Sequence, residues 1–198
     1  MLSFPHNREE NPSPAALWAT QFPRGVLCEV VAGGPSRGGQ LCLLTFLLAA
    51  RAEGGFAALV DGGDSFDPQT VPGEAMEHLL WVRCGELRAI LQCADTLLRD
   101  ENFPLVLIDL RSIEDTRLRR TPLSLWYRLQ RLARRNETRL ALFTARATVP
   151  SAHLRLAFTV PYPLASLDEP VHALARDLPI EVVRSRVPGA VEGLKLMA

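Results

Sequence analysis

The sequence predicts an α/β protein with a mainly parallel sheet covered by helices on both faces. Short apolar, β-branched runs alternate with helical patterns of about 10–15 residues, an order that calls for parallel βαβ crossovers. The central run Leu105–Leu110 is apolar in five of its six positions, which is typical of a strand buried on both faces. Toward the C-terminus, apolar and polar residues alternate instead. That change predicts antiparallel strands at one edge of the sheet.

The elements before the middle of the chain follow from local patterns. Residues 1–23 contain four prolines and few periodic apolar positions, so we expect an N-terminal arm, with a short helix at Ala15–Thr20, before a single core domain over 24–198. The first expected strand, Val26–Val31, leads through the turn Gly33–Gly39 into a helix. The elements expected after that turn are the helix Gln40–Arg51, the strands Phe56–Asp61 and Leu79–Val82, and the helix Glu86–Arg99.

The second half continues the alternation. After the strand Leu105–Leu110, Thr121-Pro122 supplies a helix cap and a proline for the first turn, which predicts a helix over 122–136. The remaining expected strands are Leu140–Thr144, Leu154–Val160, which has the alternation of an antiparallel strand, and Ile180–Arg186, which ends before Pro188-Gly189.

Composition and charge limit the classes of function. The 198-residue chain has 47% hydrophobic residues and a formal net charge of zero, which excludes an intrinsically disordered chain and a protein that coats nucleic acid by bulk charge. The charge is nevertheless segregated. Residues 1–110 contain 7 arginines and 14 acidic residues, whereas residues 111–155 contain 11 arginines and 3 acidic residues. Such polarity favours a docking module over an enzyme.

The chain shows no sign of export or of a metal site. Its start is polar and proline-bearing, unlike a signal peptide, and the longest apolar stretch, Leu41–Ala50, is about half of a membrane span. We therefore expect a cytoplasmic protein. The cysteines form no C-x-x-C pair and have no histidine at ligand spacing, so we expect small buried side chains and no metal. These residues are Cys28, Cys42, Cys84 and Cys93.

A glycine-rich loop between the first strand and the first helix has the spacing of a phosphate-binding loop. In G-x-x-x-x-G-K-[ST], backbone amides cradle the phosphates, the lysine reaches the β- and γ-phosphates, and the hydroxyl holds Mg²⁺. Here the lysine position is Gly39 and the hydroxyl position is Gln40. A vestigial anion cradle and a plain strand-to-helix turn both remain open readings. The candidate cradle residues are Gly33, Gly34, Ser36, Gly38, Gly39 and Gln40.

The segments that follow the glycine loop resemble those of a known protein family. Leu59–Pro68 resembles the segment after the second core strand of RecA-type recombinases, in which a glutamate orients the attacking water and Asp-Pro borders the adenine. The glutamate position is Gly63, and Asp67-Pro68 is kept. Asp109 fits the strand-end aspartate that supports Mg²⁺ in such proteins, and Val182–Pro188 resembles the strand that reaches a neighbouring subunit's nucleotide. The resemblance implies a RecA-like fold over roughly residues 24–196.

Three residues differ from those that the family uses for phosphoryl transfer. Gly39, Gln40 and Gly63 replace the lysine, the hydroxyl and the glutamate on which phosphoryl transfer depends, so we expect a pseudo-ATPase with no catalytic residues and no bound cofactor. The two DNA-binding loops of RecA are represented only by Arg111–Arg120 and Ala145–His153, without an aromatic stacking platform. Direct DNA binding is expected to be weak or indirect.

The helix over 122–136 predicts a basic surface. Leu125, Trp126, Leu129, Leu132 and Ala133 share one side of its wheel, and the other side carries arginines. This arginine-rich side has four possible interpretations. It is a solvated surface, or it binds an acidic partner, the DNA backbone or a second copy of this chain. The candidate partner-binding residues are Arg128, Arg131, Arg134 and Arg135 on this helix, with Arg184 and Arg186 near the C-terminus.

Together these features resemble the ImuA/SulA group of RecA relatives. An ImuA-like role implies an adaptor in SOS mutagenesis and translesion synthesis that docks RecA, an ImuB-type polymerase-like protein and an error-prone replicative-type DNA polymerase. A SulA-like role implies a cell-division inhibitor that binds FtsZ. A residual nucleotide-binding switch, or a RecA-like ATPase relative, is a third alternative.

Overall fold

A seven-stranded sheet forms the centre of the computed structural model, which describes residues 22–34, 36–175 and 178–187. Its strand order is β3-β2-β4-β5-β1-β6-β7. The expected helix at Ala15–Thr20, the arm up to residue 21 and the turn Pro188-Gly189 lie outside the described residues. The strands are β1 (Leu27–Val31), β2 (Ala57–Asp61), β3 (Leu79–Arg83), β4 (Leu105–Asp109), β5 (Arg139–Thr144), β6 (Leu154–Phe158) and β7 (Ile180–Ser185).

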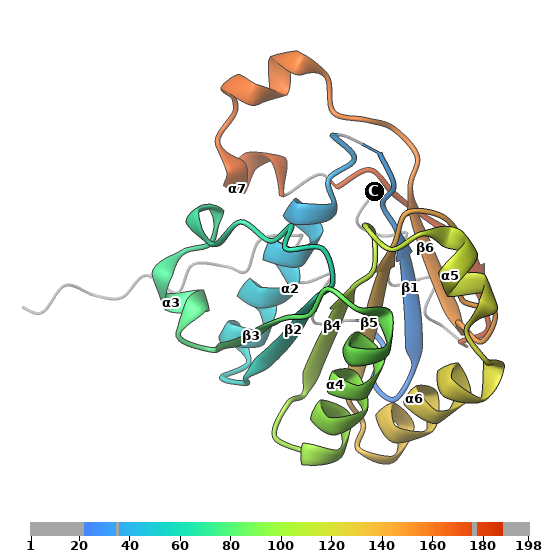
Figure 1. Ribbon diagram of the computed structural model, residues 1–198. Coiled ribbons are helices and arrows are strands. Elements are labelled where there is room, and N and C mark those ends of the chain that lie inside the picture. The colour runs from blue at the N-terminus through green and yellow to red at the C-terminus, as the bar shows by residue number, and fades with distance from the viewer. Residues whose placement is uncertain (1–21, 35, 176–177, 188–198) are drawn as a thin grey trace, which may run out of the picture.

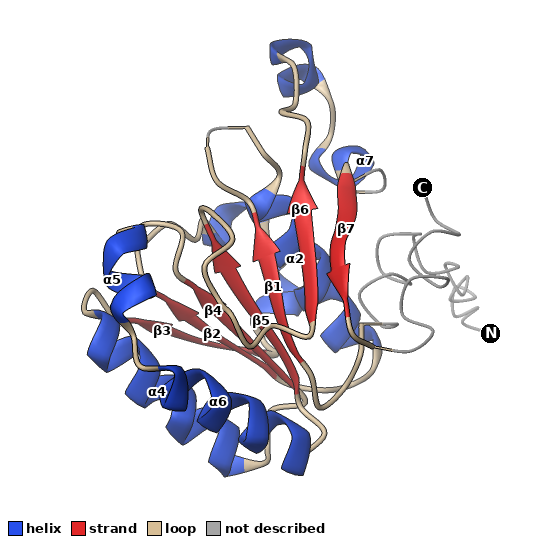
Figure 2. Ribbon diagram, turned by 90° about the vertical axis from the view of Figure 1, so that its right-hand side faces the viewer, coloured by secondary structure: helices blue, strands red, loops and turns tan. Residues whose placement is uncertain are grey.

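Helices cover both faces of this sheet (Figures 1 and 2). They are α2 (Gly39–Ala52), α3 (Gly73–Met76), α4 (Leu87–Asp100), α5 (Asp115–Arg120), α6 (Leu123–Arg135) and α7 (Val171–Leu174), with 3-10 turns η1 (Pro68–Thr70) and η2 (Leu164–Asp168). One core cluster packs α2 and α3 against one face, and a second packs α4, α5 and α6 against the other. β2, β4 and β5 are buried at every position, and their sequences are apolar except for polar residues at their ends. The predicted α/β class is confirmed.

The predicted antiparallel edge at the C-terminal side of the sheet is confirmed by the antiparallel pair of β6 and β7. On its other side β6 pairs parallel with β1, with Val30 opposite Leu156, although its alternating residues favoured an antiparallel strand. The alternation has another cause, because Arg155 and Ala157 point to a face that is only partly covered. Antiparallel pairing is therefore confined to the β6–β7 edge, where the register shifts between Arg155 and Leu156.

The helix expected over 122–136 is present as α6, but its buried face is rotated from the predicted one. Trp126, Leu129 and Ala133 are buried, whereas Leu125 is 39% exposed and Leu132 only half-buried. Leu125 lies about a quarter-turn from the buried centre at 3.6 residues per turn. Gln130 takes a core position instead, where its Oε1 accepts from the amide of Leu27 (2.6 Å) and its Nε2 donates to the carbonyl of Gly25 (3.0 Å).

The cysteines fall into two groups. Cys28 and Cys42 are buried as expected, and burial raises the pKa of both thiols. Cys84 and Cys93 are only half-buried, which corrects the expectation that all are core residues. Burial, with a smaller contribution from neighbouring Cys84, raises the pKa of Cys93 to about 11. Within the described part of the chain, no helix has both the length and the apolar composition to cross a membrane.

A buried carboxylate on β1 holds the connection from β5 to β6 in place. Glu29 of β1 is fully buried, and its Oε1 accepts from the amides of Thr148 (2.6 Å) and Val149 (3.0 Å) and from the hydroxyl of Thr144 (3.0 Å). Its Oε2 accepts from Nε of Arg155 at 2.6 Å, and Nη2 of Arg155 donates to the carbonyl of Val149 at 3.0 Å. One side chain thus joins β1, β5, β6 and the connecting loop.

Removing the cation of this pair is expected to destabilise the fold. Arg155→Leu leaves Glu29 charged and buried without a counter-ion, so we expect the free energy of unfolding to fall by about 3–5 kcal/mol in urea titrations. Arg131→Leu is the matched control, because Arg131 is exposed on α6 and forms no ion pair within the described residues. Equal effects of the two substitutions would contradict the structural role of the Glu29–Arg155 pair.

Candidate functional site

The glycine loop lies at the carboxyl end of β1 and runs into α2, the position predicted from the sequence. Its backbone requires glycine at particular places. A Cβ on Gly33 would lie 1.9 Å from the carbonyl oxygen of Ala145, and Gly34 and Gly38 have φ angles of 94° and 76°. Gly38 is also the residue before the first turn of α2, where it provides no capping side chain. The loop is a tight strand-to-helix connection, so glycine here has a structural reason.

The space above Gly39 is filled by Arg111. A Cβ on Gly39 would lie 2.1 Å from Nη1 of Arg111, so the guanidinium covers the first turn of α2. The guanidinium also lies over the ring of Phe143, with Cζ 5.9 Å from the centroid. Burial lowers the pKa of Arg111, but hydrogen bonding and charge from Asp109 outweigh it, and the resulting pKa is raised. A permanent cation at the end of β4 therefore occupies the place where a residue-39 side chain would begin.

Asp109 has no free acceptor position for a further ligand. The amide and Nε of Arg111 donate to Oδ1 at 3.0 and 2.9 Å, while Nη2 of Arg111 and the hydroxyl of Ser65 donate to Oδ2. Four donors match the roughly four lone-pair positions of a carboxylate. Asp109, at the end of β4, thus forms an ion pair with Arg111, whose guanidinium lies against Gly39.

The loop after β2 is built around a buried aspartate. Asp61 accepts from the amides of Gly63, Ser65 and Phe66 and from the indole of Trp81. This arrangement leaves no room for a side chain at the position of the family's catalytic glutamate. A Cβ on Gly63 would lie 2.2 Å from the hydroxyl oxygen of Ser112.

Gln40 and Asp67 come together through the backbone. Nε2 of Gln40 donates to the carbonyl oxygen of Asp67 and to the hydroxyl of Thr70, both at 3.3 Å. The carboxylate of Asp67 accepts from the amide of Gln69 at 3.0 Å and caps η1. Both predicted nucleotide-binding residues therefore serve to hold the 67–70 segment against α2.

A cavity of about 350 Å³ remains over the glycine loop. The chain after β6 covers it, since the amide of Tyr162 donates to the carbonyl of Ser36 (2.7 Å) and Nη1 of Arg37 donates to the carbonyls of Phe158 and Thr159. Among the predicted nucleotide-binding residues, Gly33, Asp67 and Asp109 do not line this cavity. Those that do are Gly34, Ser36, Gly38, Gly39 and Gln40, together with Arg37 and Arg111.

The predicted arginine surface is divided. Arg128 forms a two-bond ion pair with Asp95 of α4 (2.5 and 2.9 Å), and its hydrogen bonds lower the pKa of that carboxyl. Arg131, Arg134 and Arg135 are exposed and form no ion pair within the described residues. Arg184 and Arg186 lie at edge strand β7, two strands away from β1, so the structure does not join them to the α6 arginines.

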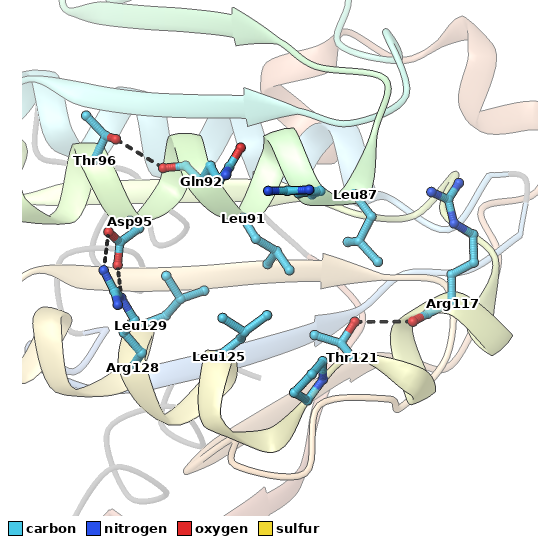
Figure 3. A pocket seen from close by; sticks show the side chains of 12 residues that line it. Leu87, Leu91, Gln92, Asp95, Thr96, Arg117, Thr121, Leu125, Arg128 and Leu129 are labelled. Atoms are coloured by element: carbon cyan, nitrogen blue, oxygen red, sulfur yellow. Dashed lines mark hydrogen bonds and ion pairs between the residues drawn. The ribbon is translucent and has the colours of Figure 1, made fainter.

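A groove between α4 and α6, which the sequence did not predict, has a volume of about 820 Å³. We call it the α4–α6 groove. Figure 3 shows Leu91 and Leu125 pointing toward each other across it, with the Asp95–Arg128 ion pair bridging the helices at one end. Its leucines are Leu87, Leu91, Leu125 and Leu129, and its arginines are Arg88, Arg117 and Arg128.

The chain matches no protein-family model and no curated protein. Among residues 22–34, 36–175 and 178–187, no three His, Cys, Asp or Glu side chains gather as a metal site would require. The candidate functional features of the chain are therefore the glycine loop, the arginines of α6 and the α4–α6 groove.

The contact between Gly39 and Arg111 predicts a context-dependent mutation. Gly39→Ala should lower the free energy of unfolding by about 1–3 kcal/mol, because the new methyl displaces the guanidinium from Asp109. In an Arg111→Ala background the same change should be neutral or stabilising, since alanine is the better helix former.

Gly73→Ala is the control in these urea titrations, because a Cβ at Gly73, in the first turn of α3, meets nothing within 4 Å. If Gly39→Ala lowers the free energy of unfolding equally with and without Arg111, the guanidinium is not the reason that position 39 requires glycine.

Proposed function

We propose that this chain is a non-catalytic, cytoplasmic RecA-like adaptor of the ImuA type, which docks RecA and an ImuB-type polymerase-like protein during translesion synthesis. The observation that carries the proposal is the Arg111–Asp109 pair over Gly39. Phosphoryl transfer requires a lysine and a metal-bound carboxylate near the γ-phosphate. Here the guanidinium of Arg111 lies where a side chain at residue 39, the lysine position, would begin, and the carboxylate of Asp109 is bound to that guanidinium.

The loop after β2 supports the same conclusion. A water-orienting glutamate at position 63 would overlap Ser112, and Asp61 is occupied by four donors from the loop. The polar groups at the carboxyl ends of β2 and β4 bind one another and hold the surface in shape. A preorganised surface without a catalytic group suits a docking protein.

The arginines of α6 provide the docking surface in this proposal. Arg131 and Arg135 are one turn apart on the exposed side of a helix anchored by Trp126 and Gln130. Their guanidinium groups are available for bidentate bonds to carboxylates of a partner. The backbone of α6 is fixed by its buried side, so the exposed side can change without loss of the fold.

Loss of two of these arginines is expected to weaken partner binding. Arg131→Ala/Arg135→Ala should weaken capture of RecA or the ImuB-type partner about tenfold, equivalent to about 1.4 kcal/mol, while the far-UV spectrum and melting temperature stay unchanged. Arg119→Ala/Arg120→Ala is the control, because it removes the same charge from the exposed side of α5. Equal binding by both double variants would refute the assigned surface.

A residual nucleotide-binding switch is the second candidate, favoured by the cavity over the glycine loop with Arg37 and Arg111 in its lining. A ligand that binds only the native state must raise the melting temperature. For an adaptor, we expect no shift with millimolar ATP or GTP in the presence of Mg²⁺. A saturable rise that Arg111→Ala abolishes would favour the switch instead.

A further inference from the structure

We propose that the α4–α6 groove binds an acidic amphipathic helix of a partner protein, with leucine-sized side chains facing the groove and carboxylates facing its arginines. This inference rests on the proposed docking function and specifies the chemistry of the docked segment. The groove combines apolar side chains, unpaired cationic charge and walls formed by two helices.

The apolar part of the groove is incompletely covered. Leu87, Leu91 and Leu129 are each less than one-tenth exposed and form its base, whereas Leu125 is 39% exposed on the α6 wall. Figure 3 shows Leu125 directed into the space rather than away from it. A leucine-sized side chain placed there would remove apolar surface from water on both partners. The groove is therefore suited to apolar anchors.

The charges at the groove are cationic after internal pairing. Its one acidic lining residue, Asp95, is bound by both Arg128 and Arg99. Arg88 is exposed on α4 and has no ion-pair partner among the described residues, and Arg117 pairs only with Glu86, whose side chain is 77% exposed. Carboxylates of a partner can reach Arg88 directly and can replace Glu86 at Arg117. Charge complementarity thus selects an acidic occupant.

The walls also determine the occupant's backbone conformation. Both are helices whose amides and carbonyls bond internally, so the groove offers no strand edge to an extended peptide. A bound segment must satisfy its own backbone hydrogen bonds, which a helix does. α4 has 14 residues and α6 has 13, or about 20 Å at 1.5 Å per residue, which accommodates a helix of three to four turns.

The same lining disfavours single-stranded nucleic acid. None of the described residues that line the groove is aromatic, so they offer bases no stacking platform. The leucine base would lie against phosphate or sugar, where it adds nothing to affinity. A polyanion could meet the arginines but would not depend on Leu125.

The direct test is binding of a fluorescent 14-residue helical peptide with leucines at i, i+4, i+7 and i+11 and glutamates on its other side, followed by anisotropy. We expect saturable binding that weakens at least tenfold with Leu125→Glu in the groove and with Arg88→Glu at its rim. The matched controls are Leu123→Glu, because Leu123 is 52% exposed on the same helix but outside the groove, and Arg119→Glu on α5. Neither control should weaken binding more than about twofold.

Two further probes separate the ligand classes. A peptide with lysines in place of glutamates, and one with serines in place of leucines, should each bind at least tenfold more weakly. Comparable binding by either, equal effects of Leu125→Glu and Leu123→Glu, or no binding of the acidic peptide would overturn the inference. So would stronger binding of a single-stranded oligonucleotide that is insensitive to Leu125→Glu.

Failure of the groove and failure of the adaptor role have different signatures. If the acidic peptide does not bind but Arg131→Ala/Arg135→Ala still weakens capture of RecA or the ImuB-type partner, the groove inference is wrong and the adaptor role stands. If the peptide binds as described but neither protein is captured by the wild-type chain, the ligand class of the groove stands and the adaptor role fails.

Discussion

The guanidinium of Arg111 lies where four segments meet. It bonds to Asp109 at the end of β4, approaches Ser65 in the loop after β2, covers Gly39 at the start of α2 and lies over Phe143 of β5. Each contact restricts its neighbour: Asp109 has no spare acceptor, Gly39 cannot carry a side chain, and the Ser65 loop is drawn toward the sheet. Arg111 thereby fills part of the carboxyl end of the sheet, where ligands bind in open α/β folds, and borders the cavity that remains over the glycine loop.

The proposed docking surfaces lie on the opposite side of the sheet from α2. α4 and α6 present the α4–α6 groove and the exposed arginines, and both helices are fixed by large buried residues such as Trp126 and Ile90. The segregation of charge along the sequence has a structural counterpart here. Acidic residues surround β2 and β3, while the arginine-rich segment forms α5 and α6.

The sequence was sufficient for features that depend on local patterns. Continuous apolar runs identified β4, and Thr121-Pro122 located the start of α6 within a residue or two. It was insufficient where the outcome depends on partners distant in the chain. In the sequence, Arg111 is one of several arginines in a charged segment. Its contact with Gly39 depends on the position of α2, which the sequence does not reveal. Leu125 fitted an apolar stripe, and only the position of α4 leaves it exposed.

The direction of β6 and the role of Gln130 could not be read locally either. Alternation of apolar and polar residues reports which face of a strand is covered, and at a partly covered edge such as β6 it arises in a strand that pairs parallel with one neighbour. A glutamine next to an apolar stripe gives no sign that the amide of Leu27 lies within reach. An aspartate or glutamate inside an apolar strand run, as at Asp61 and Glu29, is the signal that can be recognised, because a buried carboxylate requires several donors.

The bonds that Glu29 makes to the loop after β5 also bear on the order of folding. Its acceptors bind the amides of Thr148 and Val149, which lie 119 and 120 residues along the chain. These contacts cannot form until β1, β5 and β6 have assembled, because closing so long a segment costs chain entropy that only the completed sheet offsets. The connection between β5 and β6 is thereby expected to form together with the sheet rather than before it. The amides of Thr148 and Val149 are therefore expected to exchange with solvent through global unfolding, like those of the buried strands.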